Sequence, residues 1–390
     1  MNEISIYVHI PFCESKCFYC DFNSGKYSDK IQEKYFNALK NEILQNKIKN
    51  KIKSIYFGGG TPSVVQEKYI VEILNLIKNN FDVKNDAEIT IECNPNSLNK
   101  NKLIAFNNAG FNRISLGVQT TNKKSLKIIG RITDKNKLKN YKKAIKNNLK
   151  FAKKLGFNIS ADLMLGLPKN NIFNLISDIF FLNKYCKHIS VYMLTLYEGT
   201  KLFKIYKNES LENKITKEYK LASKLLKLLK YDQYEISNFA KSNAFSKHNL
   251  NYWASGEYLG FGLSAHSFIQ EFRYSNFESM QEYLNAFENA KFQFDQKEKD
   301  EIIKQNKTLN LQMEKLTQEQ KAEEYIMLNL RLKSGLNLTE FKNKFYNLEI
   351  SKADEIKNLL AQKLIAKKDD RIVLTNKGKI FENQVAVRLI

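Results

Sequence analysis

The sequence predicts an α/β fold in which crossover helices join the strands of a parallel sheet, followed by a small helical domain. Six short runs rich in β-branched and aromatic residues recur between residues 5 and 194, with helix-type segments between them. This alternation is typical of parallel sheets. The pattern changes at about residue 292, where charged, helix-rich sequence begins.

The predicted strands end in residues suited to a binding site. In order, the runs are SIYVHIP (5–11), KSIYFGGG (53–60), AEITIECNP (87–95), RISLGVQ (113–119), NISADLMLGLP (158–168) and HISVYML (188–194). Ligands of parallel α/β folds gather at the carboxyl ends of the strands. We therefore expect the site where these runs end.

The rest of the chain predicts one large and one small domain. A further β-type run at 233–240 leads into HNLNYW (248–253) and EYLGFGLSAHS (257–267), whose glycines predict a tight turn beside the barrel mouth. Two β-type pieces then flank Asp369 and Asp370 as in a hairpin. We expect a first domain at residues 1–290 and a helical domain with a β-wing at 291–390.

The formal charge of +22 does not by itself indicate a nucleic-acid-binding protein. Most of the basic residues are Lys and only six are Arg, and they are spread along helical segments such as 135–154. We therefore expect solvated helix faces and no nucleic-acid partner. The N-terminus lacks the pattern of a secretory signal and no stretch is apolar enough for a membrane helix, which predicts a cytoplasmic protein. Transient contact with a membrane surface stays open.

Cys13, Cys17 and Cys20 follow the first predicted strand in a C-x3-C-x2-C pattern. Three thiolates so closely spaced can converge on one [4Fe–4S] cluster, with one iron left open to a small molecule. Zinc is an alternative, but its fourth ligand would be His9, which would have to turn back from the strand. Cys93 and Cys186 are isolated, and we expect them to be buried free thiols.

The cysteine pattern resembles the radical S-adenosylmethionine (SAM) superfamily. Seven further segments resemble one group within it: FGGGTPS, IECNP, RISLGVQ, Gly130-Arg131, DLMLGLP, HNLNYW and GFGLSAHS. This group contains oxygen-independent coproporphyrinogen III oxidase and the HemW-type haem chaperones. The resemblance spans about residues 5–270. It implies a partial (β/α) barrel of the radical SAM type, a small winged-helix-like C-terminal domain, a [4Fe–4S] cluster on the three cysteines, and SAM at the open iron.

The resemblance also implies which residues contact SAM. An aromatic ring beside the last cysteine could pack on adenine, and glycines at a strand end could let a ligand approach the backbone, with a tight turn as the less favoured alternative. An amide, a cation and an anion could bind the ribose, the carboxylate and the amine of SAM. The expected set is Tyr7, Tyr19, Gly59, Gly60, Thr61, Glu92, Gln119, Arg131 and Asp162.

Two departures from the oxidase pattern favour the chaperone branch. The oxidase has a further cysteine two residues after the cluster motif and an N-terminal extension, whereas this chain has Asp21-Phe22 and its first cysteine at position 13. The HNLNYW segment resembles the chaperones, which implies His248 as a haem ligand with Tyr252 and Trp253 against the porphyrin. For His266 the resemblance implies a position near the cofactor. A structural hydrogen bond is an equally good explanation of this histidine.

We therefore expect a protein that carries haem, or another porphyrin, to acceptor proteins. The alternative is oxidative decarboxylation of coproporphyrinogen III, so whether the chain is an enzyme stays open. A third, weaker alternative is a radical enzyme that modifies nucleic acid, suggested by the charge and the winged C-terminus.

Overall fold

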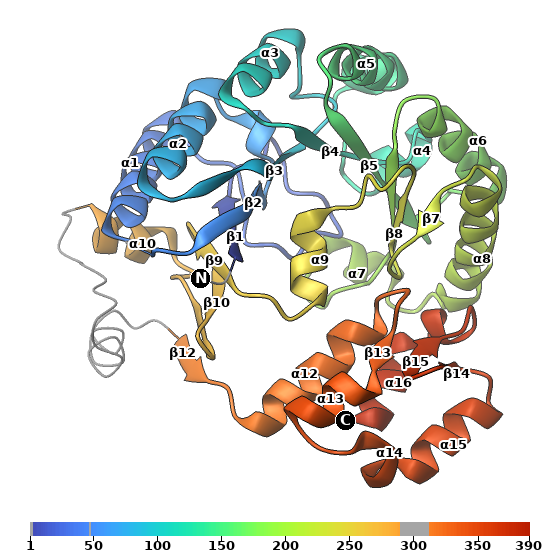
Figure 1. Cartoon of the computed structure of the whole chain (residues 1–390). Helices are drawn as coiled ribbons and strands as arrows, with labels where there is room; N and C mark the ends of the chain where they lie inside the picture. Colours follow the sequence, from blue (N-terminus) through green and yellow to red (C-terminus); the bar gives the residue numbers. More distant parts are fainter. Residues whose placement is uncertain (1–2, 47, 289–311) are drawn as a thin grey trace.

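The computed structural model describes residues 3–46, 48–288 and 312–390 of the chain (Figure 1). Its larger sheet has twelve strands in the order β12-β11-β10-β9-β1-β2-β3-β4-β5-β6-β8-β7. Strands β1 to β6 are parallel and follow one another in chain order, with helices packed on their outer side (Figure 1). The expected α/β partial barrel is confirmed.

The six predicted strands form where the sequence places them, because their alternate side chains are apolar and fill the core between sheet and helices. The run RISLGVQ, for example, is buried along its whole length as β4. The parallel strands are β1 (Glu3–Ile10), β2 (Lys51–Gly59), β3 (Val83–Cys93), β4 (Arg113–Gln119), β5 (Asn158–Leu165) and β6 (His188–Met193).

The crossover helices cover the sheet with one apolar face each. In α2, Ile70, Ile73, Leu74 and Ile77 are buried, which is the spacing of one helix face. Several helices begin at a side-chain cap, as where Asp134 accepts from the Lys137 amide at 2.7 Å. These helices are α1 (Asp29–Gln45), α2 (Glu67–Asn80), α3 (Lys100–Ala109), α4 (Lys123–Ile128), α5 (Lys135–Lys154), α6 (Ile172–Asn183), α7 (Lys201–Tyr206) and α8 (Glu212–Leu228).

The run predicted at 233–240 is interrupted in the structure. It turns back on itself, because β7 (Asp232–Gln233) and β8 (Asn238–Ala240) pair with each other in antiparallel fashion, and the residues of the turn contact the C-terminal domain. The Ile236 amide donates to the Arg331 carbonyl at 3.1 Å, and Glu235 bridges to Leu332. These contacts join the large sheet to the C-terminal part of the molecule.

The segment after β8 closes one side of the barrel. Helix α9 (Lys247–Trp253) lies among the strands in Figure 1, and β9 (Tyr258–Phe261) pairs in parallel with β1. The remaining elements of this part are β10 (His266–Ile269), β11 (Phe272–Ser275), α10 (Met280–Phe287) and β12 (Gln312–Lys315). The predicted domain boundary at 290/291 lies outside the described residues, and β12 still belongs to the large sheet.

The C-terminal part has its own apolar core, which includes Ile326, Phe341 and Leu359. The predicted hairpin around Asp369 and Asp370 is confirmed, because β14 and β15 pair in antiparallel fashion. The elements are α12 (Gln318–Leu330), β13 (Leu336–Asn337), α13 (Leu338–Lys344), α14 (Leu348–Ser351), α15 (Ala353–Ala361), β14 (Ile365–Lys368), β15 (Arg371–Leu374) and α16 (Glu382–Leu389).

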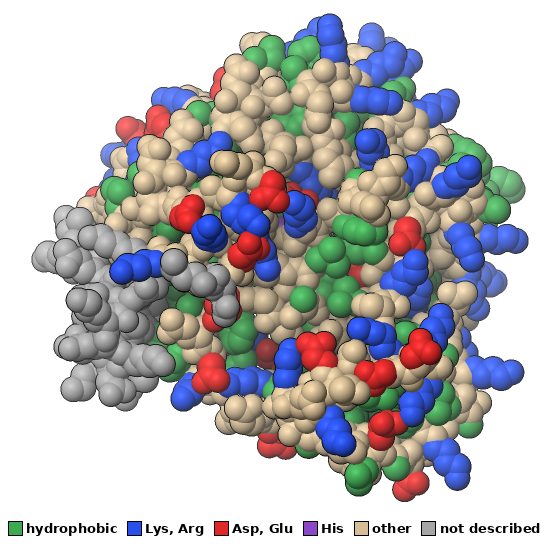
Figure 2. All heavy atoms as spheres, in the orientation of Figure 1, with side chains coloured by type: hydrophobic (Ala, Val, Ile, Leu, Met, Phe, Trp, Pro, Cys, Tyr) green, Lys and Arg blue, Asp and Glu red, His purple; other side chains and the backbone are tan. Residues whose placement is uncertain are grey.

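Basic side chains are spread over the whole visible face, with Asp and Glu side chains among them (Figure 2). The predicted basic helix at 135–154 forms as α5, with Tyr141, Ile145 and Leu149 buried and most of its lysines exposed. On this face the charge is therefore spread over solvated surfaces. Among the described residues, none of the helices has the length and apolarity needed to span a membrane.

Candidate functional site

The three clustered cysteines lie on a loop held from both sides. The Cys13 amide donates to the Gly25 carbonyl at 2.8 Å, which closes the loop on itself just after β1. Further along, the Phe18 amide donates to the Ile129 carbonyl at 2.9 Å and the Phe18 carbonyl accepts from the Leu202 amide at 2.8 Å. Backbone hydrogen bonds to the residue that follows α4 and to the first turn of α7 therefore fix the loop.

All three thiols line one cavity of about 340 Å³ at the carboxyl end of the parallel strands. The cysteines are free and half-buried. Burial raises the pKa of the Cys13 and Cys20 thiols, so binding of iron there would displace a proton from each. Cys93 and Cys186 are buried free thiols, as expected.

The zinc alternative is not supported by the structure. His9 has one ring nitrogen 3.1 Å from the Tyr7 hydroxyl and the other 3.1 Å from the Asn23 carbonyl, so neither nitrogen is free to join the cysteines. Within the described ranges, no group of three His, Cys, Asp or Glu side chains is arranged to hold a metal ion. A four-iron cluster differs from a single ion because each cysteine binds its own iron, so its thiolates need not meet at one point.

The glycines after β2 are required by the turn itself. Gly59 has a φ of +103°, and a Cβ there would lie 2.5 Å from the His9 ring. A Cβ on Gly60 would lie 2.7 Å from the Phe12 carbonyl oxygen. The tight-turn explanation is therefore correct, although Gly59, Gly60 and Thr61 also line the cavity. The Thr61 hydroxyl lies 3.7 Å from the Cys13 sulfur.

Two carboxyl groups face the cavity from neighbouring parts of the sheet. The Tyr56 hydroxyl donates to Glu92 Oε1 at 2.7 Å, and the Ser115 hydroxyl donates to Asp162 Oδ1 at 3.3 Å. Burial, followed by the nearby Asp162, raises the pKa of Glu92 to about 7. Burial also raises the pKa of Asp162. The pair therefore offers negative charge that a cationic ligand would stabilise.

Gln119 and Arg131 carry polar atoms that the protein itself does not satisfy. Gln119 Oε1 and Arg131 Nε are buried without a hydrogen-bond partner, and Gln119 sits at a φ of 65°. The rest of the Arg131 guanidinium donates to the Gly117 carbonyl at 2.8 Å and lies 3.5 Å from the Cys17 sulfur. Unsatisfied buried polar atoms are costly, so their presence in the cavity wall fits a polar ligand.

The structure brings nearly all the expected residues together. Tyr19 lines the cavity beside the cysteines, and only Tyr7 of the set lies outside the lining. Tyr7 stacks on Tyr56 at 6.3 Å between ring centroids, and so lies behind the wall. Eleven further residues line the cavity that the sequence did not assign to it. Five of them lie on or near the cluster loop and six lie within the predicted strand runs: Glu14, Ser15, Lys16, Phe22, Ser24, Cys93, Asn94, Ser115, Gly117, Met164 and Tyr192.

His248 is not placed as the haem assignment requires. Its side chain is buried, with Nδ1 2.9 Å from the Ser54 hydroxyl and Nε2 3.0 Å from the Tyr252 hydroxyl. Burial, followed by the charges of Arg113 and Lys53, lowers the pKa of His248 to about 3, so the ring is neutral. Both nitrogens are engaged, and the ring offers none to haem iron. The expectation that His248 is an axial ligand is therefore corrected.

Comparison with known proteins identifies the family of the chain. Residues 7–182 match the radical SAM superfamily, and residues 316–381 match the HemN C-terminal domain. The chain is 31% identical to the Bacillus subtilis protein named heme chaperone HemW, over 98% of this chain and 97% of that one. A heme chaperone HemW of Buchnera aphidicola (subsp. Schizaphis graminum) is 34% identical over 99% of this chain and 98% of its own length.

The fold is also that of a solved enzyme. The structure of Escherichia coli coproporphyrinogen III oxidase (HemN), described as a radical SAM enzyme, matches with a TM-score of 0.80. The match covers 100% of this chain and 90% of that one at 21% identity, which supports the fold alone. The sequence identity above 30% over the full length, in contrast, is to proteins named heme chaperone HemW. The chain belongs to the HemW family of the radical SAM superfamily.

Proposed function

We propose that this chain is a haem carrier that holds a [4Fe–4S] cluster on Cys13, Cys17 and Cys20 and binds SAM beside it. The observation that carries the cofactor part is the single cavity lined by the three thiols together with Glu92, Gln119, Arg131 and Asp162. No other set of described residues combines three cysteines with unsatisfied polar atoms. The reduced cluster would supply an electron to the bound SAM.

The chain's own residues would hold SAM by charge and by hydrogen bonds. The Glu92 and Asp162 carboxylates would face the cationic groups of SAM, and Gln119 Oε1 would accept from a hydroxyl or amine of the ligand. The Arg131 side chain lies between the cluster loop and β4, so it would bind the ligand carboxylate near the cysteine sulfurs. Tyr19 would pack on the adenine.

We place haem at the rim of this cavity, with His266 as its ligand. Three of the four histidines, His9, His188 and His248, are buried with both ring nitrogens in hydrogen bonds. His266 is exposed. The cavity itself is near the lower end of the usual size range for ligand sites, so a porphyrin beside SAM would extend outside it.

The surroundings of His266 support this placement. Ser264, two residues before it, accepts a hydrogen bond from Asn23 of the cluster loop at 2.6 Å. The neighbouring Phe22 lines the cavity and is 59% exposed, so its ring is available to an apolar ligand. An exposed imidazole could bind the iron of a haem, and an exposed phenyl ring near it could pack against the apolar face of the porphyrin.

The competing function is decarboxylation of coproporphyrinogen III. The position after the cluster motif is Asp21-Phe22, without the cysteine expected of the oxidase. To test the two, the anaerobically reconstituted chain is incubated with coproporphyrinogen III, SAM and a reductant, and the products are read by mass spectrometry. The carrier proposal expects the propionates to remain intact, and conversion to vinyl groups at enzyme-like rates would overturn it.

The haem itself would pass to acceptor proteins, and we expect this to take place in the cytoplasm. The relatives named heme chaperone support delivery as the purpose of binding. The His266→Ala variant tests the ligand: it should weaken haem binding or shift the Soret band. An unchanged affinity and spectrum would exclude His266 as the axial ligand.

A further inference from the structure

Several side chains of the segment His248–Trp253 make contacts within the protein. The Asn251 side-chain amide donates to the Glu257 carbonyl at 3.0 Å, and the Trp253 ring lies 4.6 Å from the Arg331 guanidinium of the C-terminal domain. His248 and Tyr252 bond to one another. The Asn251 and Trp253 contacts therefore tie α9 to other parts of the molecule, and the His248–Tyr252 bond lies within the helix.

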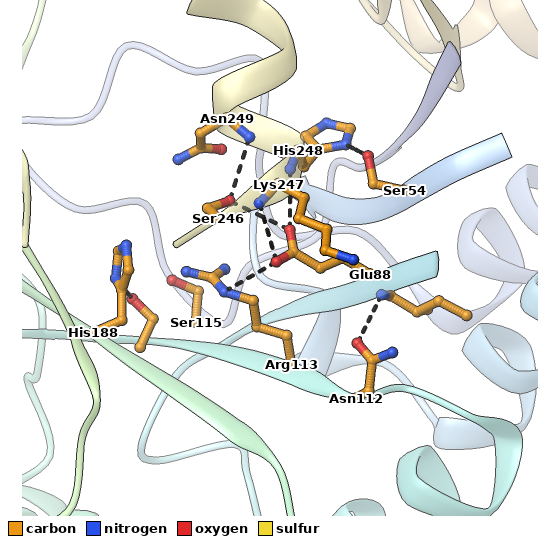
Figure 3. A network of polar contacts seen from close by, with 12 residues as sticks. Ser54, Glu88, Asn112, Arg113, Ser115, His188, Ser246, Lys247, His248 and Asn249 are labelled. Carbon is orange, nitrogen blue, oxygen red and sulfur yellow. Dashed lines mark hydrogen bonds and ion pairs between the residues drawn. The ribbon is translucent and has the colours of Figure 1, made fainter. Parts of the chain in front are cut away.

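The N-terminal end of α9 is held inside the barrel by one carboxylate. Glu88 of β3 accepts from the backbone amides of Lys247 and His248, each at 3.1 Å, and lies 3.8 Å from Arg113 Nε (Figure 3). Glu88 and Arg113 are both buried. A negative charge at a helix N-terminus is favourable, and here it also balances a buried cation.

The anchored helix sets the position of the His248 ring. On β2, Ser54 and Tyr56 point to the same side of the strand, because side chains two residues apart share a face. His248 bonds to Ser54 and its ring stacks on Tyr56, with centroids 5.0 Å apart and planes at 25°. Tyr7 of β1 also stacks on Tyr56, with centroids 6.3 Å apart. Tyr56 thus contacts two further rings.

The far end of Tyr56 reaches the cavity wall. Its hydroxyl donates to Glu92 Oε1 at 2.7 Å, and Glu92 lines the cavity that holds the three cysteines. A continuous path therefore runs from Glu88 through the start of α9, His248 and Tyr56 to Glu92. It leads from the middle of β3 to its carboxyl-terminal end.

We propose that the HNLNYW segment positions the SAM site through His248 and Tyr56, and that its histidine is a positioning residue and not a haem ligand. The inference rests on the proposed SAM site. His248 supports the Tyr56 ring, and Tyr56 directs one oxygen of Glu92 and thereby fixes the other toward the ligand. Loss of the His248 ring leaves Tyr56 free to tilt and releases its bond to Glu92.

The test measures SAM affinity in the anaerobically reconstituted full chain, with iron content and the cluster absorbance recorded for every variant. His248→Ala and Tyr56→Phe should each raise the SAM dissociation constant about tenfold, the effect of losing one hydrogen bond to a charged group. Both should retain the cluster. His248→Phe keeps a flat ring beneath Tyr56 and should stay within about threefold of the wild type.

The matched control is His188→Ala. His188 is buried, and it also bonds to a serine, Ser160, at 2.7 Å and to a tyrosine, Tyr234, at 2.8 Å, but no ring contact joins it to Tyr56. Its loss should lower stability as the loss of His248 does and leave SAM affinity unchanged. If His188→Ala weakens SAM binding as much as His248→Ala, the effect is general destabilisation and the proposal fails.

Haem titration of the same variants separates positioning from ligation. The proposal expects His248→Phe to bind haem with an unchanged Soret band, whereas an axial ligand cannot be replaced by a phenyl ring. Wild-type SAM affinity in Tyr56→Phe overturns the proposal even if His248→Ala fails to fold. Absence of SAM binding in the wild type would instead contradict the proposed function, and the first titration shows this before any variant is used.

Discussion

The amide of Thr61 donates a hydrogen bond to the carbonyl of Phe12 at 2.8 Å, so the glycine-rich turn after β2 is tied to the residue that precedes the first cluster cysteine. The Gly60 amide makes a second such bond, to the Ile10 carbonyl at 2.8 Å. The turn and the cluster loop therefore form one unit. A substitution that distorts the turn is therefore expected to disturb the cluster loop as well as ligand binding in the cavity.

This unit predicts the result of Gly60→Ala. The new Cβ would lie 2.7 Å from the Phe12 carbonyl oxygen and 2.9 Å from that of Ile10, both backbone atoms that cannot move aside cheaply. We expect loss of iron together with loss of SAM binding, measured as iron and sulfide per chain. Gly25→Ala is the control, because its Cβ would meet only the Tyr27 side chain, at 3.4 Å. A variant at Gly60 with full iron content would contradict the account.

The cysteine assignment predicts two classes of variant. Replacing Cys13, Cys17 or Cys20 with Ala should abolish or severely deplete the cluster, because each thiolate binds its own iron. Cys93→Ala and Cys186→Ala should retain it, since these thiols are buried in the apolar core. Iron analysis and the cluster absorbance distinguish the classes. Equal loss in all five variants, or zinc without iron, would refute the assignment.

The raised pKa of Glu92 predicts a pH dependence of SAM binding. With its pKa at about 7, the carboxyl is mostly charged above that pH and mostly neutral below it. A cationic ligand is attracted by the charged form, so affinity should fall several-fold, roughly fivefold to tenfold, between about pH 8 and pH 6. Glu92→Gln should bind more weakly and show less of this dependence. Any protonation of SAM itself affects the wild type and Glu92→Gln equally. Identical pH profiles of the two proteins would therefore exclude Glu92 as a binding partner of SAM.

The Glu88–Arg113 pair predicts a large effect on stability. Glu88→Ala leaves the Arg113 cation buried without its partner and removes the acceptor of two α9 amides. We expect a loss of about 3–5 kcal/mol in the free energy of unfolding, measured by denaturant titration. Glu340→Ala removes an exposed pair with Lys344 and should cost less than about 1 kcal/mol. Similar losses in the two variants would mean that α9 is not held by Glu88.

The sheet and the cluster site could be predicted because their signals are local. Short β-type runs mark each parallel strand, and the carboxyl ends of such strands must meet at one edge, which brought Glu92, Gln119 and Asp162 to the cysteines. The same rule could have found Tyr192, which ends a run recognised as a strand. The turn between β7 and β8 could not be predicted, because its residues carry no turn signal and are held by contacts with the C-terminal domain.

The histidine assignment failed for a related reason. A motif shows that His248 matters, but the sequence does not show whether its ring faces a ligand or the interior. Its two partners, Ser54 and Tyr252, come from separate elements, and the former is far away in the sequence. Burial of a neutral imidazole between two hydroxyl groups is a tertiary property.

The haem-carrier proposal is tested most directly by titration of the anaerobically reconstituted chain with haem, followed at the Soret band, before and after SAM is added. We expect saturable binding that persists in His248→Phe and is weakened or spectrally shifted in His266→Ala. Absence of saturable haem binding in the wild-type protein, with cluster and SAM both in place, would contradict it.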